Sequence, residues 1–94
     1  MPKEKAPKTD REKYMLKIIA QNIRHFRTLN NLSQTELGLR ADLTPTYITD
    51  IENCKHDIMV STLVHIADSL DIKLEELFNE DREEYLSKTR IDQK

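Results

Sequence analysis

The sequence predicts an all-α fold of five helices, and three observations support it. The 94 residues include one Gly and three Pro, too few turn-forming residues for a chain of many short strands. Apolar residues recur at helical spacing in several short segments. A Ser or Thr stands just before three of these segments, where it can cap a helix. The length allows one domain with one modest core.

The first helix is predicted to begin after Thr9, because Thr9 and Glu12 have the spacing of a capping box. Residues 1–9 before it are predicted to form a flexible basic tail. The helix ends near residues 30–31, where Asn tolerates the left-handed conformation that closes a helix. Its apolar positions follow the helical period, and they are Leu16, Ile19, Ala20, Ile23, Phe26 and Leu29.

Two short helices follow, each with a clear start signal. Ser33 and Glu36 form a second capping box, which predicts a helix over residues 34–41. After a tight turn, Thr44 is an N-cap and Pro45 occupies the first helical position, where its missing N–H costs nothing. Two short helices joined by such a turn make a helix-turn-helix motif.

The remaining segments predict a fourth helix, a fifth helix and a charged end. An irregular link at residues 54–59 leads to the fourth helix, and residues 71–73 form the next turn. Residues 81–94 are predicted to be a charged C-terminal helix or tail, which leaves 10–80 as the domain. The apolar positions of the fourth helix are Leu63, Ile66, Ala67 and Leu70, and those of the fifth are Leu74, Leu77 and Phe78.

The helix-turn-helix geometry favours binding to double-stranded DNA. An α-helix fits the major groove, and residues near its N-terminus reach the base edges. Helix N-termini also present N–H groups to phosphates. A helix pair packed inside a larger bundle shows similar caps, so the spacing alone leaves that alternative open. Small polar residues that permit close approach of the backbone are Ser33, Gln34, Thr35, Thr44 and Thr46.

The charge distribution fits a nucleic-acid partner better than the net charge of −2 does. Residues 1–40 carry nine basic and four acidic side chains, a charge of +5. Residues 41–94 carry six basic and thirteen acidic side chains, a charge of −7. A chain of this kind can place a basic face on phosphate and keep an acidic face in water. The alternative is that the asymmetry only aids solubility.

Other classes of function have little support. No apolar run approaches the length of about 18 residues that a membrane span needs, and the N-terminus has no apolar signal segment. The single cysteine, Cys54, cannot form an internal disulfide, so we expect a cytoplasmic protein. His25, His56 and His65 lack metal-ligand spacing. No catalytic pair or phosphate-binding Gly loop is present, so we expect no enzyme, cofactor or metal.

Several segments together resemble the Cro/repressor (XRE) helix-turn-helix family. They are residues 32–37, 41–44, 47–53, 63–72 and 77–78. The resemblance covers about residues 19–78 and implies a lambda-repressor-like domain that binds a palindromic operator as a homodimer. Within the family the chain is most similar to controller proteins of restriction–modification systems, with phage-type and plasmid repressors as close rivals.

The resemblance implies particular DNA contacts and one internal ion pair. Arg27 and Glu52 match a partly buried pair that joins the first helix to the third. Positions that match phosphate contacts are Ser33, Gln34 and Asn53. Positions on the base-facing side of the recognition helix, about residues 45–53, are Pro45, Thr46 and Asp50, with Tyr47 and Thr49 alongside. The expected interface also includes Thr35, Thr44 and Lys55.

Two departures weaken the expected reading of bases. Pro45 stands where many relatives carry a Gln or Arg, and it can offer only an apolar contact to a thymine methyl. Asp50 can accept a hydrogen bond from cytosine but repels phosphate. The recognition helix has no Arg or Lys before Lys55, so we expect modest base readout and some reliance on DNA shape.

Two further departures concern the ends of helices. Cys54 occupies the place of the family's helix-ending Gly, so Asn53 is expected to take the left-handed conformation instead, unless the helix runs on. Met59 replaces the usual N-cap of the fourth helix, which should cost about 1 kcal/mol.

The apolar residues left over after one small core predict a dimer contact at Leu74, Leu77, Phe78 and Tyr85, with Leu86 beside them. The alternative function is an antitoxin-like or adaptor module that keeps the fold but binds a protein partner. The acidic second half of the chain motivates this alternative. Its partner surface would be Tyr14, Met15 and Ile18.

Overall fold

The computed structural model describes residues 7–80, and within this range it is all-helical, as predicted. Helix α1 (Asp10–Leu29) begins at the expected capping box. The Thr9 hydroxyl accepts a hydrogen bond from the Glu12 N–H at 3.1 Å, and the Glu12 carboxylate accepts one from the Thr9 N–H at 2.9 Å. Asn31 follows the helix in the left-handed conformation, with φ 59°. Part of the predicted basic tail and all of residues 81–94 lie outside the described residues.

The other elements are α2 (Gln34–Ala41), α3 (Pro45–Glu52), α4 (Val60–Leu70) and η1 (Leu74–Phe78). The prediction of a fifth α-helix was wrong, because η1 is a short 3₁₀ helix. Its turn is closed by a bond from the Glu76 N–H to the Lys73 carbonyl at 3.0 Å. The side chain of Leu77 is fully buried in the core, and a short connecting segment of this kind is where 3₁₀ helices usually occur.

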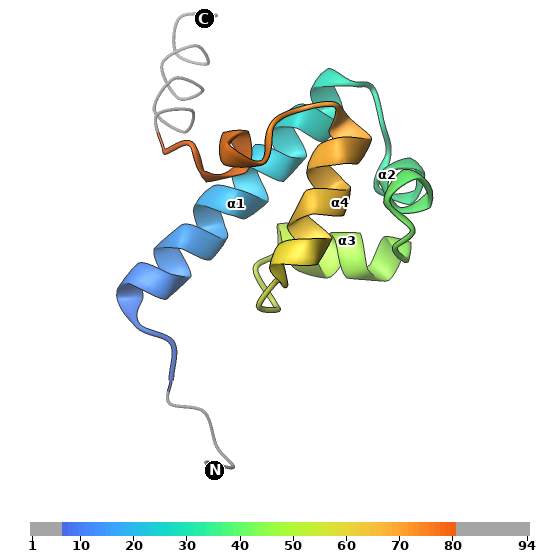
Figure 1. The fold of residues 1–94 in the computed structure, drawn as a ribbon. Helices are drawn as coiled ribbons and strands as arrows, with labels where there is room; N and C mark the ends of the chain where they lie inside the picture. Colours follow the sequence, from blue (N-terminus) through green and yellow to red (C-terminus); the bar gives the residue numbers. More distant parts are fainter. Residues whose placement is uncertain (1–6, 81–94) are drawn as a thin grey trace, which may run out of the picture.

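The core lies where α1, α3, α4 and η1 meet, and α2 packs against α3 and α4 (Figure 1). Each element contributes fully buried apolar side chains, among them Ile23, Leu37, Ile48, Ile66 and Leu77. None of the described helices is long and apolar enough to cross a membrane.

Gly38 lets α2 approach the turn that leads into α3. A Cβ added at this residue would lie 2.6 Å from the Leu43 carbonyl oxygen, closer than real Cβ atoms come. The Leu43 N–H donates to the Gly38 carbonyl at 2.8 Å, and Asp42 takes the left-handed conformation between them. Because Gly38 has no Cβ, α2 can pack closely against the turn that leads into α3.

The buried face of α1 differs from the predicted apolar stripe. Ile18, which we expected on a partner surface, is only 1% exposed, whereas Leu29 is 66% exposed. Tyr14 remains exposed and donates a hydrogen bond to Glu80 at 3.3 Å. Asn22 is buried, and its amide donates to the carbonyls of Leu77 at 2.9 Å and Asn79 at 3.1 Å. This amide joins η1 to α1.

The link after α3 turns at a different residue from the one predicted. Cys54 itself takes the left-handed conformation, with φ 60°, while Asn53 has φ −99°. The Lys55 N–H then bonds to the Asp50 carbonyl at 2.9 Å, which closes the end of the helix. At the start of α4, Met59 makes no side-chain cap, as expected.

Candidate nucleic-acid interface

The two helices of the motif begin at caps that use side-chain hydroxyls. The Ser33 hydroxyl accepts from the Glu36 N–H at 3.0 Å, and the Glu36 carboxylate accepts from the Ser33 N–H at 2.8 Å. The bond from the Ser33 N–H to the Glu36 carboxylate is the main cause that holds the pKa of Glu36 below its ordinary value, and the Ser33 side chain adds to it. The Thr44 hydroxyl caps α3 by accepting from the Tyr47 N–H at 3.1 Å, and Pro45 follows at the first helical position. Both starts follow the sequence prediction because each cap spans only three residues.

One face of α3 is buried and the other faces outward. Ile48, Ile51 and Glu52 point into the protein. The outward face carries residues that differ in exposure: Pro45, Thr46 and Asn53 are exposed, and Thr49 and Asp50 are half-buried. These five residues share one side of the helix at helical spacing. The predicted base-facing residues are therefore gathered on one surface, with Tyr47 half-buried at its edge.

Glu52 is the centre of a buried polar network. Its side chain is 1% exposed and accepts from Arg27, Nε to Oε2 at 2.7 Å and Nη2 to Oε1 at 3.0 Å. The exposed Arg24 contacts the same carboxylate more loosely, at 3.5 Å. Burial opposes ionisation most strongly, but the bonds from Arg27 and Gln34 and the two arginine charges outweigh it, so the pKa of Glu52 lies below its ordinary value.

Gln34 links this network to the recognition helix. Its Nε2 donates to Glu52 Oε1 at 3.0 Å, and its Oε1 accepts from the Thr49 hydroxyl at 2.8 Å. The Thr49 hydroxyl also lies 3.1 Å from the Pro45 carbonyl. Gln34 is thus engaged inside the protein at both ends of its amide, which its predicted role as a phosphate contact did not foresee. The partners come from α3, and local sequence carries no signal for them.

Asp50 has a partner that the sequence did not reveal. His56 Nε2 lies 3.1 Å from Asp50 Oδ2, and the His56 ring lies 6.0 Å from the Tyr47 ring. The left-handed turn at Cys54 brings His56 back toward the helix that it follows. When His56 is protonated, its charge offsets the carboxylate of Asp50 on this surface.

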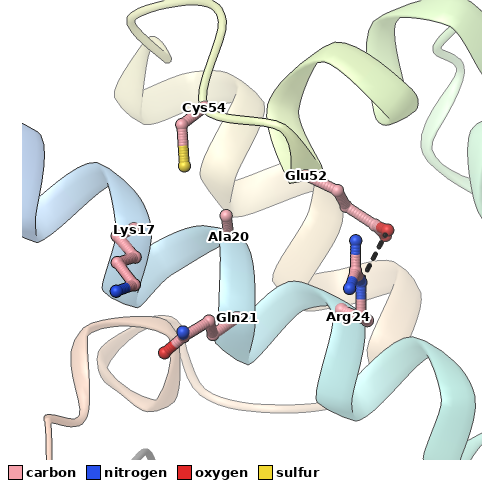
Figure 2. A pocket seen from close by; sticks show the side chains of 6 residues that line it. All are labelled: Lys17, Ala20, Gln21, Arg24, Glu52 and Cys54. Carbon is pink, nitrogen blue, oxygen red and sulfur yellow. Dashed lines mark hydrogen bonds and ion pairs between the residues drawn. The ribbon is translucent and has the colours of Figure 1, made fainter.

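A surface pocket of about 230 Å³ lies between α1 and the end of α3 (Figure 2). Its lining residues are Lys17, Ala20, Gln21, Arg24, Glu52 and Cys54. In Figure 2 the Cys54 thiol points toward Ala20, and Arg24 reaches Glu52. Within residues 7–80, no cluster of His, Cys, Asp or Glu is able to hold a metal ion.

The residues predicted for the dimer contact are placed differently from the prediction. Leu77 is 0% exposed within the core, so it cannot form a surface without unfolding η1. Leu74 is partly buried and packs against the same core. Phe78 is exposed, while Tyr85 and Leu86 lie outside the described residues. The prediction was wrong for Leu77 because the single core uses more apolar residues than the sequence pattern suggested.

Comparison with known proteins identifies the type of domain. A sequence model described as helix-turn-helix matches residues 23–77, which run from the last third of α1 into η1. The chain belongs to this helix-turn-helix family. The finding confirms the resemblance to the Cro/repressor regulators. The members are DNA-binding transcriptional regulators and not enzymes, and this helix-turn-helix protein is accordingly a DNA-binding transcriptional regulator.

Similar proteins carry regulatory names. The chain is 37% identical over 60 residues to the control protein C.SmaI of Serratia marcescens, covering 64% of this chain and 71% of that protein. It is 32% identical over 80 residues to the immunity repressor of Bacillus phage phi105, covering 79% of this chain and 56% of the repressor. The crystal structure of the restriction-modification controller protein C.AhdI from Aeromonas hydrophila superposes with a TM-score of 0.65 at 30% identity. That superposition covers 67% of this chain and 96% of C.AhdI.

Proposed function

We propose that this helix-turn-helix regulator binds a palindromic operator as a homodimer, with α3 in the major groove. The observation that carries the proposal is the polar, outward face of α3. The bond between Gln34 and Thr49 fixes α3 against α2 and so fixes the orientation of this face. A rigid helix pair of this kind presents one polar surface to a groove at little conformational cost. The names of the relatives extend the proposal to control of restriction–modification genes, in the cytoplasm.

The expected contacts divide into two groups. Phosphates would be met at the start of α2 and at the link after α3, and bases would be met by the outward face of α3. Pro45 and Asp50 still limit direct readout, so DNA shape contributes to selectivity. The residues proposed to contact phosphates are Ser33, Gln34, Thr35, Asn53 and Lys55. The residues proposed to face the bases are Thr44, Pro45, Thr46, Tyr47, Thr49 and Asp50.

The dimer contact is better placed on α4 than on Leu74 and Leu77. Met59 is 68% exposed, Val60 is 66% exposed and Val64 is 37% exposed, and the two valines lie one helical turn apart. An apolar strip at the start of a helix is expensive to leave in water and matches a second copy of itself. A palindromic operator requires such a self-complementary contact.

The dimer is tested by sedimentation of a Val60→Asp, Val64→Asp double variant. We expect the wild-type protein to sediment as a dimer at tens of micromolar and the variant as a monomer. Leu39→Asp is the matched control, because Leu39 is an apolar residue of α2 that is 77% exposed. A monomeric wild-type protein, or a dimeric double variant, would contradict this placement.

Operator binding is tested by selecting duplexes from a random library at near-physiological salt and sequencing them. We expect a palindrome with half-sites about ten base pairs apart, and binding that weakens steeply as salt rises. Gln34→Ala should weaken binding strongly. Gln21→Ala is the control, because Gln21 lies on α1 and its Oε1 accepts no hydrogen bond from the described residues.

A protein-interaction module remains the second candidate, and the outward carboxylate of Asp50 favours it, because this charge repels phosphate. A selection that enriches no sequence and leaves only salt-sensitive background binding would support the module. Capture of a protein partner would then be the next experiment.

A further inference from the structure

The hydroxyl of Thr49 donates its proton to an acceptor within the protein. A hydroxyl carries one proton, and both of its neighbours in this structure are carbonyl oxygens. Gln34 Oε1 lies 2.8 Å away and the Pro45 carbonyl lies 3.1 Å away. Neither oxygen can donate, so the proton of Thr49 is directed to one of them. The lone pairs of the hydroxyl are what remains for a group outside the protein.

The orientation of Gln34 depends on the buried carboxylate of Glu52. A carboxylate only accepts hydrogen bonds, so the amide must turn its Nε2 to Glu52 Oε1, which lies 3.0 Å away. The carbonyl end of the amide then necessarily faces Thr49. Arg27 and Arg24 keep Glu52 ionised and in place. The order of donors and acceptors therefore runs outward from Glu52 to the surface of α3.

We propose that buried Glu52, acting through Gln34, makes Thr49 a hydrogen-bond acceptor toward DNA, so that position 49 selects an exocyclic amino group. In the major groove these donors are N6 of adenine and N4 of cytosine, whereas guanine and thymine offer only acceptors there. A free threonine hydroxyl suits either kind of base, because it rotates to donate or accept. The inference deepens the proposed function and rests on it.

The same network gives Gln34 two tasks. One N–H of its amide is used by Glu52, and an amide nitrogen carries a second. That second N–H is compatible with the phosphate contact proposed above. Gln34 is thus a positioning residue for Thr49, and its effect on base choice is separable from its effect on affinity.

The experiment uses the selected operator with one exocyclic amino group removed at a time. Each adenine of a half-site is replaced in turn by purine, which lacks the N6 amino group, and each cytosine by 2-pyrimidinone, which lacks the N4 amino group. We expect one such replacement to weaken the wild-type protein by about 3- to 10-fold, the range of a single net hydrogen bond. Thr49→Val should be insensitive to that replacement, and Thr49→Ser should retain the sensitivity.

The positioning role is tested with Gln34→Met, which keeps the length of the side chain and removes the amide. Its affinity for all sequences falls if the phosphate contact is lost. The distinctive readout is the preference at the Thr49 position. Discrimination of adenine or cytosine against guanine or thymine should fall below that of wild type, because only the Pro45 carbonyl, at 3.1 Å, then accepts the proton of Thr49. A merely structural role would lower affinity and leave this preference intact.

Two outcomes overturn the inference while the proposed function stands. One is an operator that wild type and Thr49→Val bind with the same base preference throughout. The other is a Thr49-dependent position that requires guanine or thymine, since the hydroxyl would then be a donor. If no operator is enriched at all, the proposed function fails and this inference fails with it.

Discussion

The guanidinium of Arg27 holds the carboxylate of Glu52 by two hydrogen bonds, at 2.7 Å and 3.0 Å, and joins α1 to the end of α3. A third bond from Arg27 Nη1 reaches the Leu32 carbonyl at 2.9 Å, just before α2. One side chain thus ties together three segments that the proposed DNA surface depends on. The pair matters for architecture, because it sets where α3 lies.

Loss of Arg27 should destabilise the fold strongly. Arg27→Met leaves the Glu52 carboxylate buried without its main partner, and we expect the free energy of unfolding to fall by about 3 kcal/mol. Arg24→Met is the matched control. Its side chain is 58% exposed and lies 3.5 Å from Glu52, so we expect a loss below about 1 kcal/mol. Urea unfolding measures both, and equal losses would contradict the ranking.

Acid should weaken the fold through Glu52. Its pKa is lowered in the folded protein, so the unfolded chain binds more protons in mild acid. The stabilisation is complete above the ordinary value of 4.5 and is lost as the pH falls through the lower, folded pKa. Unfolding measured in urea from pH 6 downward should therefore show a steeper decline for wild type than for Glu52→Gln.

Glu36 contributes to the acid response with the same sign, because its pKa is also lowered. Glu36→Gln separates its contribution, since it removes only the capping carboxylate at the surface. If the free energies of unfolding of wild type and Glu52→Gln fall in parallel below pH 4.5, the ionised state of Glu52 does not stabilise the fold as we expect.

Gly38 should tolerate no side chain. Gly38→Ala places a Cβ 2.6 Å from the Leu43 carbonyl oxygen, so the turn must move, at a cost of about 2 kcal/mol. The neighbouring Leu39→Ala provides the control, because Leu39 is largely exposed and should change stability by less than about 0.5 kcal/mol. Thermal unfolding distinguishes them. A Gly38→Ala protein as stable as wild type would show that the turn is looser than the structure indicates.

Adding a cap at Met59 should stabilise α4. The residue already has the extended conformation of an N-cap, with φ −69° and ψ 147°, but makes no side-chain cap. Met59→Ser supplies a hydroxyl and should raise the free energy of unfolding by about 1 kcal/mol. Met59→Ala is the comparison that removes the thioether without adding a cap. Equal stability of the two variants in urea would argue against the missing cap.

Removing the charge of Asp50 should strengthen binding to DNA of any sequence. Asp50→Asn keeps the size of the side chain and removes the repulsion from phosphate, so we expect about a 3-fold gain at low salt that shrinks as salt screens the charge. Asp68→Asn is the control, because Asp68 is an exposed residue of α4. Fluorescence anisotropy with an unrelated duplex measures both. A gain that persists in high salt would point to a cause other than charge.

The sequence by itself determined the features that depend on neighbours a few residues apart. The caps at Thr9, Ser33 and Thr44 were predictable because each links a side chain to a backbone group three residues on. Pro45 after Thr44 and the left-handed Asn31 have equally local causes. These signals were enough for an all-α fold with a helix-turn-helix, and the family resemblance added the expected contact residues.

The tertiary structure decided what depends on residues distant in the chain. The partners of Asn22 are 55 and 57 residues away, and Gln34 meets Thr49 and Glu52 only because α2 packs on α3. Helical periodicity indicates an apolar face but not its limits, so the burial of Ile18 and of Leu77 had to come from packing. A hydrogen bond or a filled core needs both partners in place, and only the folded chain brings them together.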